Sequence, residues 1–199
     1  MKADITKHAT AMGWFGILAV AVFCIMWLAC MAADDTWVWG ENAISDFGVS
    51  DTDAADYFEY GCMVSGILLA AFGAGLALTS GPRTGLLAAG TFYALAGVCI
   101  IFIGQYDSDY NGGNAHSFFA WTAALLLLGA MIASAAQYWQ CGKLALGGIA
   151  VTLFCIICAC VLAFEFEKWE VWSAVVMLAW TAMVAGYQMT SHINRGRSQ

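Results

Sequence analysis

The chain has 199 residues, of which 62% are hydrophobic and only 11% are charged, and its mean hydropathy is +0.75. A soluble globular domain carries about 25% charged residues, so this composition excludes one and indicates a membrane protein. The net charge of −7 also excludes nucleic acid as a partner, because binding to phosphates needs clustered Lys and Arg.

Six stretches along the chain are long and apolar enough to cross a bilayer, for which a helix needs about 20 residues. They leave no room for a separate soluble domain, so we expect one membrane domain over residues 1–199, an all-α bundle of six helices. The first stretch follows Lys2 and Lys7 but is too long for the apolar part of a signal peptide, and we expect it to be retained. The predicted spans are 12–31, 61–79, 86–104, 118–139, 144–164 and 171–190.

Acidic and basic residues alternate between the connections of these spans. Thirteen of the fourteen Asp and Glu residues fall in 33–60, 105–115 and 165–170, whereas six of the seven Lys and Arg residues fall in the other connections and at the two ends. Basic residues are enriched on the cytoplasmic side of membrane proteins. We therefore expect both termini in the cytoplasm, under a plasma or inner membrane, and the acidic connections outside.

The first outer connection, 33–60, is the longest, and the alternation of Trp37 and Trp39 near its start predicts a segment lying along the membrane surface. The connection continues with Asn42-Ala43-Ile44-Ser45-Asp46-Phe47-Gly48, which is rich in residues that form turns and caps. In one interpretation these side chains only satisfy their own backbone. In the other, Ser45 and Asp46 point into a cavity between helices.

The second and third spans carry matching small residues, which are Gly66, Ala70 and Gly73 in one and Gly90, Ala94 and Gly97 in the other. The spacing i, i+4, i+7 places each set on one helix face, where small side chains let two backbones approach closely. We expect the two helices to pack as a hairpin that turns at Ser80-Gly81-Pro82-Arg83.

The second outer connection contains Asp107-Ser108-Asp109-Tyr110-Asn111-Gly112, which resembles the start of a calcium loop with alternate oxygen ligands. The twelfth position, where an EF-hand has a bidentate glutamate, is Phe118, so a complete EF-hand is excluded. Two interpretations remain open. Either Asp107, Asp109 and Asn111 bind Ca²⁺ together with acidic groups from other connections, or the segment is a solvated polar turn.

His116 begins the fourth span directly after this segment and is the only histidine on the predicted outer side. An imidazole at this position can act as a general base, bind a metal or simply start a helix. One histidine cannot supply the three protein ligands of a catalytic zinc site, which argues against a zinc hydrolase. The interiors of the spans contain no charged residue, which argues against a proton pump.

Two features carry a resemblance to a known family: the stretch Ile44-Ser45-Asp46-Phe47-Gly48 in a long first outer connection, and a second outer connection that ends in His116. With the six-span layout they resemble the prokaryotic membrane family catalogued as domain of unknown function 998. That family is distantly similar to eukaryotic Frag/DRAM/Sfk-like membrane proteins, which have a similar Ile-Ser-Asp-x-Gly stretch. The resemblance implies lipid handling and marks Ser45, Asp46, Gly48 and His116 as functional positions. An Asp/Asn/Gly segment replaces the family's proline-bearing turn before the histidine, so no role carries over to Asp107.

Three functions follow from these patterns. The first is lipid binding or modification at an outward-facing polar site, with Ser45, Asp46 and His116 as candidate catalytic residues and membrane lipids as partners. The second is a non-enzymatic structural or partner-binding role, in which Ca²⁺ stabilises the acidic outer connections. The third is transport of a small solute, which is disfavoured because no internal repeat or proline-broken span is visible. A homo-oligomer is compatible with each.

Overall fold

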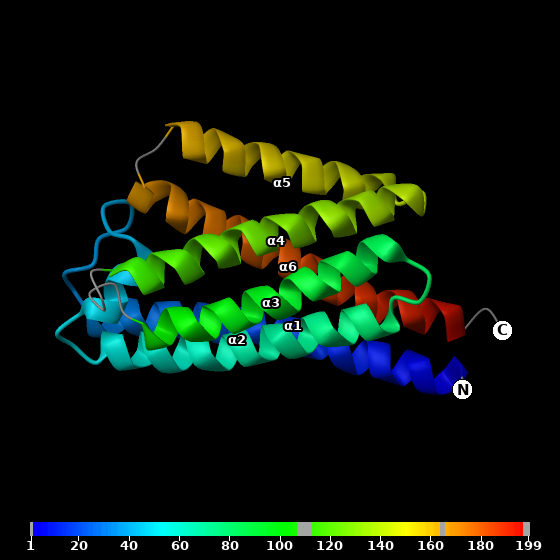
Figure 1. Ribbon diagram of the computed structural model, residues 1–199, viewed down its shortest axis with the longest axis horizontal. Helices are drawn as coiled ribbons and strands as arrows, with labels where there is room; N and C mark the ends of the chain where they lie inside the picture. Colours follow the sequence, from blue (N-terminus) through cyan, green and yellow to red (C-terminus); the bar gives the residue numbers. More distant parts are fainter. Residues whose placement is uncertain (1, 107–112, 164–165, 197–199) are drawn as a thin grey trace.

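The computed structural model describes residues 2–106, 113–163 and 166–196, and these form an all-α bundle (Figure 1). Six helices run alternately up and down, and each contains a stretch long and apolar enough to cross a membrane. The predicted fold class is therefore confirmed. The elements are α1 (Lys2–Ala33), the short 3-10 helix η1 (Ile44–Val49), α2 (Ala54–Thr79), α3 (Thr84–Gln105), α4 (Asn114–Gln140), α5 (Leu144–Ala163) and α6 (Phe166–Gly196).

The two ends of the bundle differ in what they carry. One end holds the 34–53 segment with η1 and the starts of α2, α4 and α6, and we call it the acidic end. The opposite end holds both chain termini and the short turns between α2 and α3 and between α4 and α5 (Figure 1). Arg83 and Lys143 lie in those two turns. The predicted sorting of charges along the chain thus becomes a separation between two ends of one bundle.

Helix α2 begins at Ala54, seven residues before the predicted span, so the first connection is shorter than the predicted 33–60. The hydroxyl of Thr52 accepts a hydrogen bond from the Ala54 N–H (3.2 Å), and this starts the helix. The first turns carry Asp56 and Glu59, which are polar enough to fall outside a hydropathy window. The helix therefore extends beyond its apolar stretch. In the same way, α4 begins at Asn114 and not at residue 118.

The predicted hairpin between α2 and α3 is confirmed. A Cβ atom placed on Gly97 would lie 2.5 Å from the Gly66 carbonyl oxygen and 2.5 Å from the Ala70 nitrogen, and one on Gly66 would lie 2.6 Å from the Gly97 oxygen. The two backbones are thus in direct contact, which no larger residue allows. The turn lies at Ser80–Arg83, where Gly81 adopts the left-handed conformation (φ +60°) that favours glycine.

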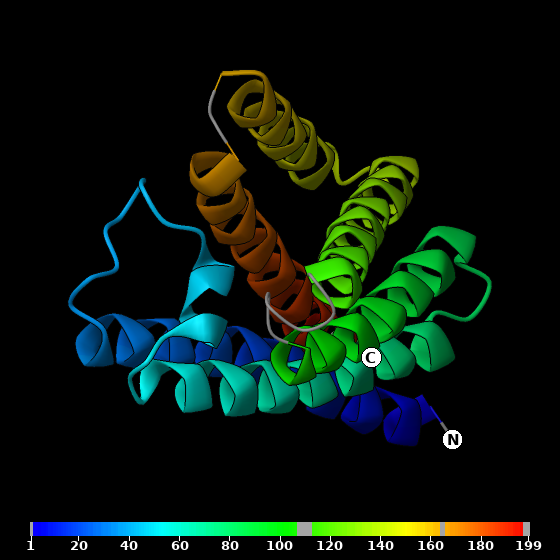
Figure 2. The same cartoon turned by 60° about the vertical axis from the view of Figure 1, so that its left-hand side comes forward.

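Helices α1 and α4 pack against this hairpin, and α5 and α6 lie beyond them. Helix α1 packs against α2 and α6. Helix α5 packs closely against α4 and α6 and lies to one side of the bundle (Figure 2). Phe72, Tyr93, Met131 and Trp180 are buried in the centre of the bundle. The Trp180 indole N–H donates to the Ser134 hydroxyl (3.2 Å) and ties α6 to α4.

The 34–53 segment folds back onto the helix ends. Trp37 is buried, donates its indole N–H to the Ala43 carbonyl (2.8 Å) and stacks on the fully buried Phe47. Trp39 stacks on Trp27 with ring centroids 5.3 Å apart and remains half exposed. Trp37 therefore packs inside the folded loop, and a position of this segment along the membrane surface stays a prediction.

Candidate functional site

Asp34 fixes the two ends of the loop that contributes to the site. One carboxylate oxygen accepts hydrogen bonds from the Thr36 N–H (3.0 Å) and the Thr36 hydroxyl (2.6 Å), and the other accepts from the Ser50 hydroxyl (2.6 Å). The hydroxyls of Ser50 and Thr36 stabilise the charged carboxylate and lower the pKa of Asp34 below its ordinary value. The chain is thereby closed into a loop just beyond the end of α1.

Asp46 organises η1 within this loop. Its Oδ2 accepts from the Ala43 N–H (2.9 Å) and from the Asn42 side-chain amide (3.3 Å). This bonding matches the interpretation in which the polar residues satisfy their own backbone. It occupies only one oxygen, however, because Oδ1 makes no hydrogen bond within the described residues. The other oxygen of Asp46 thus has no protein partner among the described residues.

His116 lies in the first turn of α4 and is only 6% exposed. Its Nδ1 is 2.8 Å from the Tyr106 carbonyl oxygen at the end of α3. A carbonyl can only accept, so we assign the ring proton to Nδ1. The remaining nitrogen, Nε2, then presents a lone pair when the ring is neutral. Within the described residues Nε2 makes no hydrogen bond.

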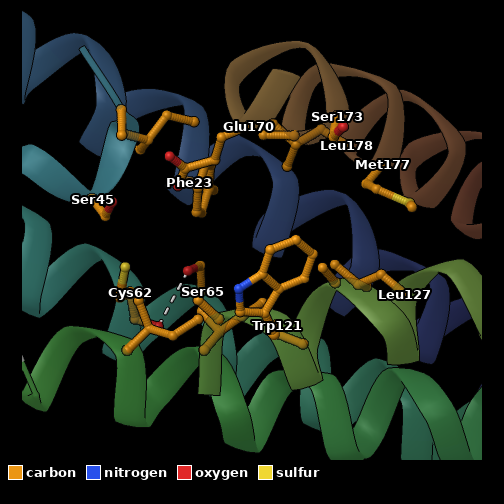
Figure 3. A pocket seen from close by; sticks show the side chains of 18 of the residues that line it. Phe23, Ser45, Cys62, Ser65, Trp121, Leu127, Glu170, Ser173, Met177 and Leu178 are labelled. Carbon is orange, nitrogen blue, oxygen red and sulfur yellow. Dashed lines mark hydrogen bonds between the residues drawn. The ribbon is translucent and has the colours of Figure 1, made fainter. Parts of the chain in front are cut away.

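Ser45, Asp46 and His116 all line one cavity of about 740 Å³, to which the loop and all six helices contribute. The structure thus brings the three predicted catalytic residues to one space. It does not join them, because no hydrogen bond links any two of them within the described residues. Figure 3 shows the residues of α6 and those of α2 on facing sides of this space, with the Trp121 ring between them.

The lining of the cavity changes from polar to apolar along the bundle. Helices α4 and α6 both start at the acidic end, and both present polar groups first and apolar ones further along. On α4 the lining begins with His116 and Ser117 and continues with Ala120, Ala124, Leu127 and Leu128. On α6 it begins with Glu170 and Ser173, continues with Ala174, Met177 and Leu178, and ends with Thr181, whose hydroxyl donates to the Met177 carbonyl (2.8 Å).

A comparison with known families matches residues 17–187 to the family described as "Protein of unknown function (DUF998)". The match runs from α1 to α6 and covers most of the chain. The chain belongs to the DUF998 family. No curated protein and no solved structure matches it. The resemblance to eukaryotic Frag/DRAM/Sfk-like proteins stays a prediction. The matched region contains the whole lining of the cavity, so the cavity is part of the DUF998 domain itself.

Two polar residues of the site in this DUF998 protein escape sequence reasoning. In the sequence, Glu170 is only one acid of the third acidic connection, and Ser173 is not singled out. Both line the cavity from α6, and the Ser173 hydroxyl is buried and makes no hydrogen bond to the described residues. The signal that could have found them is their i, i+3 spacing at the start of a span, which places them on one helix face.

The predicted calcium ligands Asp107, Asp109 and Asn111 lie outside the described residues of this DUF998 chain. Within residues 2–106, 113–163 and 166–196, no three potential His, Cys, Asp or Glu ligands are close enough to hold a metal ion. Calcium binding therefore stays a prediction.

Proposed function

We propose that this DUF998 protein binds an amphiphile in the cavity, either a membrane lipid or a molecule with a single apolar chain. The polar head lies at the acidic end. The observation that supports this most strongly is the parallel change of lining on α4 and α6. Both helices offer polar groups at the end where the loop lies and apolar groups beyond it. A ligand complementary to such a space has a polar head and an apolar tail.

The dimensions of the cavity suit a lipid tail. Twelve residues separate His116 from Leu128, the first and last lining residues of α4, and they span roughly 18 Å of helix. One leaflet of the hydrocarbon core is about 15 Å thick, half of the ~30 Å total. A tail that starts at the polar end would therefore reach about as far as the tail of a lipid in a single leaflet. A small polar solute would leave the apolar part unfilled.

The cavity also has a side that faces the surroundings of the bundle. Trp121, Leu125 and Val161 line it and yet are 50%, 65% and 47% exposed. Trp121 and Leu125 belong to α4 and Val161 to α5, so the opening lies between these two helices. In a bilayer the exposed faces of spanning helices contact lipid. A lipid tail could thus enter sideways without crossing water.

Binding has more support than turnover or transport. Nucleophilic catalysis by Ser45 would need a base within hydrogen-bonding reach. The side chain of His116 instead bonds to the Tyr106 carbonyl, and within the described residues it makes no hydrogen bond to Ser45. Transport folds commonly use broken helices around a central site. Each of the six spans here is one continuous helix.

Photo-crosslinking can test the binding. The protein is reconstituted in liposomes that contain a phospholipid with a diazirine in its acyl chain, and the modified peptides are mapped after illumination. We expect modification of cavity residues on α4 and α6, such as Leu127 and Met177, in addition to lipid-facing positions such as Leu162, which is 88% exposed. The substitution Ala124→Trp, which fills the cavity, should abolish only the first set.

The matched control is Ala136→Trp, on the same helix but exposed and outside the cavity. It should leave both sets of modified peptides unchanged. Equal modification of all lipid-facing helices, with no loss in Ala124→Trp, would show that the cavity holds no lipid tail and would refute the proposed function.

A further inference from the structure

Acceptors prevail in the polar part of the cavity, and the Asn42 side-chain amide that also lines it donates to Asp46 (3.3 Å). The carboxylates of Glu41, Asp46 and Glu170 lie there, together with His116 and the hydroxyls of Ser45 and Ser173. No lysine or arginine with a described side chain lines the cavity, since Arg83 and Lys143 lie in turns at the opposite end of the bundle. A hydroxyl can donate or accept, but three carboxylates can only accept when they are ionised.

His116 adds an acceptor that is buried. Because Nδ1 donates to the Tyr106 carbonyl (2.8 Å), Nε2 of the neutral ring offers a lone pair, and this side chain is 94% buried at 6% exposure. A ring nitrogen without a protein partner in a residue that lines a cavity can be satisfied by a ligand or by water. The group that satisfies Nε2 must carry an N–H or O–H.

We infer, on the basis of the lipid binding proposed above, that the cavity selects amphiphiles whose head carries a protonated primary amine and disfavours those with an anionic head. The lining offers the N–H groups of an ammonium head several acceptors, among them Nε2 of His116 and the carboxylates of Asp46 and Glu170. The positive charge is matched by the three acids. A trimethylammonium head keeps the charge but has no N–H, so it is expected to bind less well.

An anionic head meets the opposite situation. Its phosphate or carboxylate would be placed among three carboxylates in a site partly shielded from water, where like charges repel more strongly than in solvent. Basic groups that commonly bind phosphate, such as the fork of an arginine, are missing among the described lining residues. The same lining therefore favours one class of head and rejects the other.

A competition experiment tests this selectivity in nonionic detergent. A neutral long-chain alcohol with a diazirine labels the cavity, and amphiphiles of equal chain length compete with it. The competitors carry a primary ammonium, a trimethylammonium, a neutral sugar or a phosphate head. We expect the primary ammonium to compete most strongly, the trimethylammonium and neutral heads less, and the phosphate least. Glu170→Gln and Glu41→Gln should each lower the preference for ammonium over the neutral head by about two- to fivefold.

Comparison between variants in the same micelles cancels the partitioning of each amphiphile into detergent. Asp53→Asn is the matched control, because Asp53 is exposed at the acidic end but does not line the cavity, and it should leave the ranking unchanged. Competition by all heads with phosphate equal to or better than ammonium would overturn the selectivity while leaving lipid binding intact. No labelling of the cavity, or none that any head displaces, would instead count against the proposed lipid binding itself.

Discussion

Asp34 shows how one side chain can hold the loop that forms the polar end of the cavity. Its carboxylate accepts three hydrogen bonds, two from Thr36 and one from Ser50, and these lower its pKa. A carboxyl group with a lowered folded-state pKa stabilises the fold above its unfolded pKa, which is about 3.9. This stabilisation is lost as the pH falls through the lower folded-state value.

We therefore predict that the wild-type protein loses thermal stability below about pH 4 and that Asp34→Asn reduces this dependence. At pH 7 the variant should melt a few degrees lower, since a change of ~1 kcal/mol shifts Tm by about 2–4 °C in a chain of this size. Melting curves in detergent between pH 3 and pH 7 would measure both effects. Asp53→Asn, at an exposed position without a side-chain cap bond, should match the wild type. Identical acid profiles for Asp34→Asn and wild type would contradict the role of Asp34.

The individual site residues differ in how far the sequence could predict them. Ser45, Asp46 and His116 stand out because they are polar residues in short segments that border apolar spans. Glu170 and Ser173 do not stand out. They line the cavity only because α6 faces α4 across it, and that is a property of the packed bundle. The bonding of Asp46 inside its own loop was likewise one of two open interpretations; the structure shows this bonding for Oδ2, and Asp46 also lines the cavity.

At the scale of elements, the glycines of α2 and α3 bring the two backbones into direct contact. Gly66 and Gly97 bring backbone onto backbone, so an added methyl group must push the helices apart. We predict that Gly97→Ala lowers the free energy of unfolding by about 1–3 kcal/mol. Gly148→Ala on α5 is the matched control, because nothing lies within 4 Å of its added Cβ. Thermal unfolding of the two variants in the same detergent should separate them, and equal melting would contradict the close contact.

The hairpin was predictable because small residues at helical spacing form a face that favours close packing against another helix. The bounds of the helices were not. Hydropathy reports where a chain is apolar, whereas a helix ends where its hydrogen bonds end. Helix α2 therefore begins at Ala54, whose N–H donates to the Thr52 hydroxyl, and includes the polar Asp56 and Glu59. The burial of Trp37 was not predictable for a similar reason, because the partner of its indole N–H is the Ala43 carbonyl of the folded loop.

At the scale of the whole molecule, the separation of charges defines two ends of the bundle. The loop of residues 34–53 lies at one end, and the turns with Arg83 and Lys143 lie at the other, next to both termini (Figure 1). A lipid whose head lies at the acidic end would belong to the leaflet on that side. Which leaflet this is depends on how the bundle is inserted, and the excess of basic residues at the other end predicts that the acidic end faces outside.

Labelling of cysteines in intact cells tests this orientation. Cys141 is exposed in the turn between α4 and α5, and Asp53 is exposed at the acidic end. We predict that a membrane-impermeant maleimide labels Cys141 only after the cells are permeabilised, whereas Asp53→Cys in a Cys141→Ser background is labelled in intact cells. The Cys141→Ser variant alone gives the background from the cysteines within the spans. Labelling of Cys141 in intact cells, together with protection of Asp53→Cys, would show that the bundle is inserted in the opposite orientation. The lipid head would then lie in the inner leaflet, and the selectivity for amines could still hold, because it depends on the lining of the cavity and not on the side of the membrane.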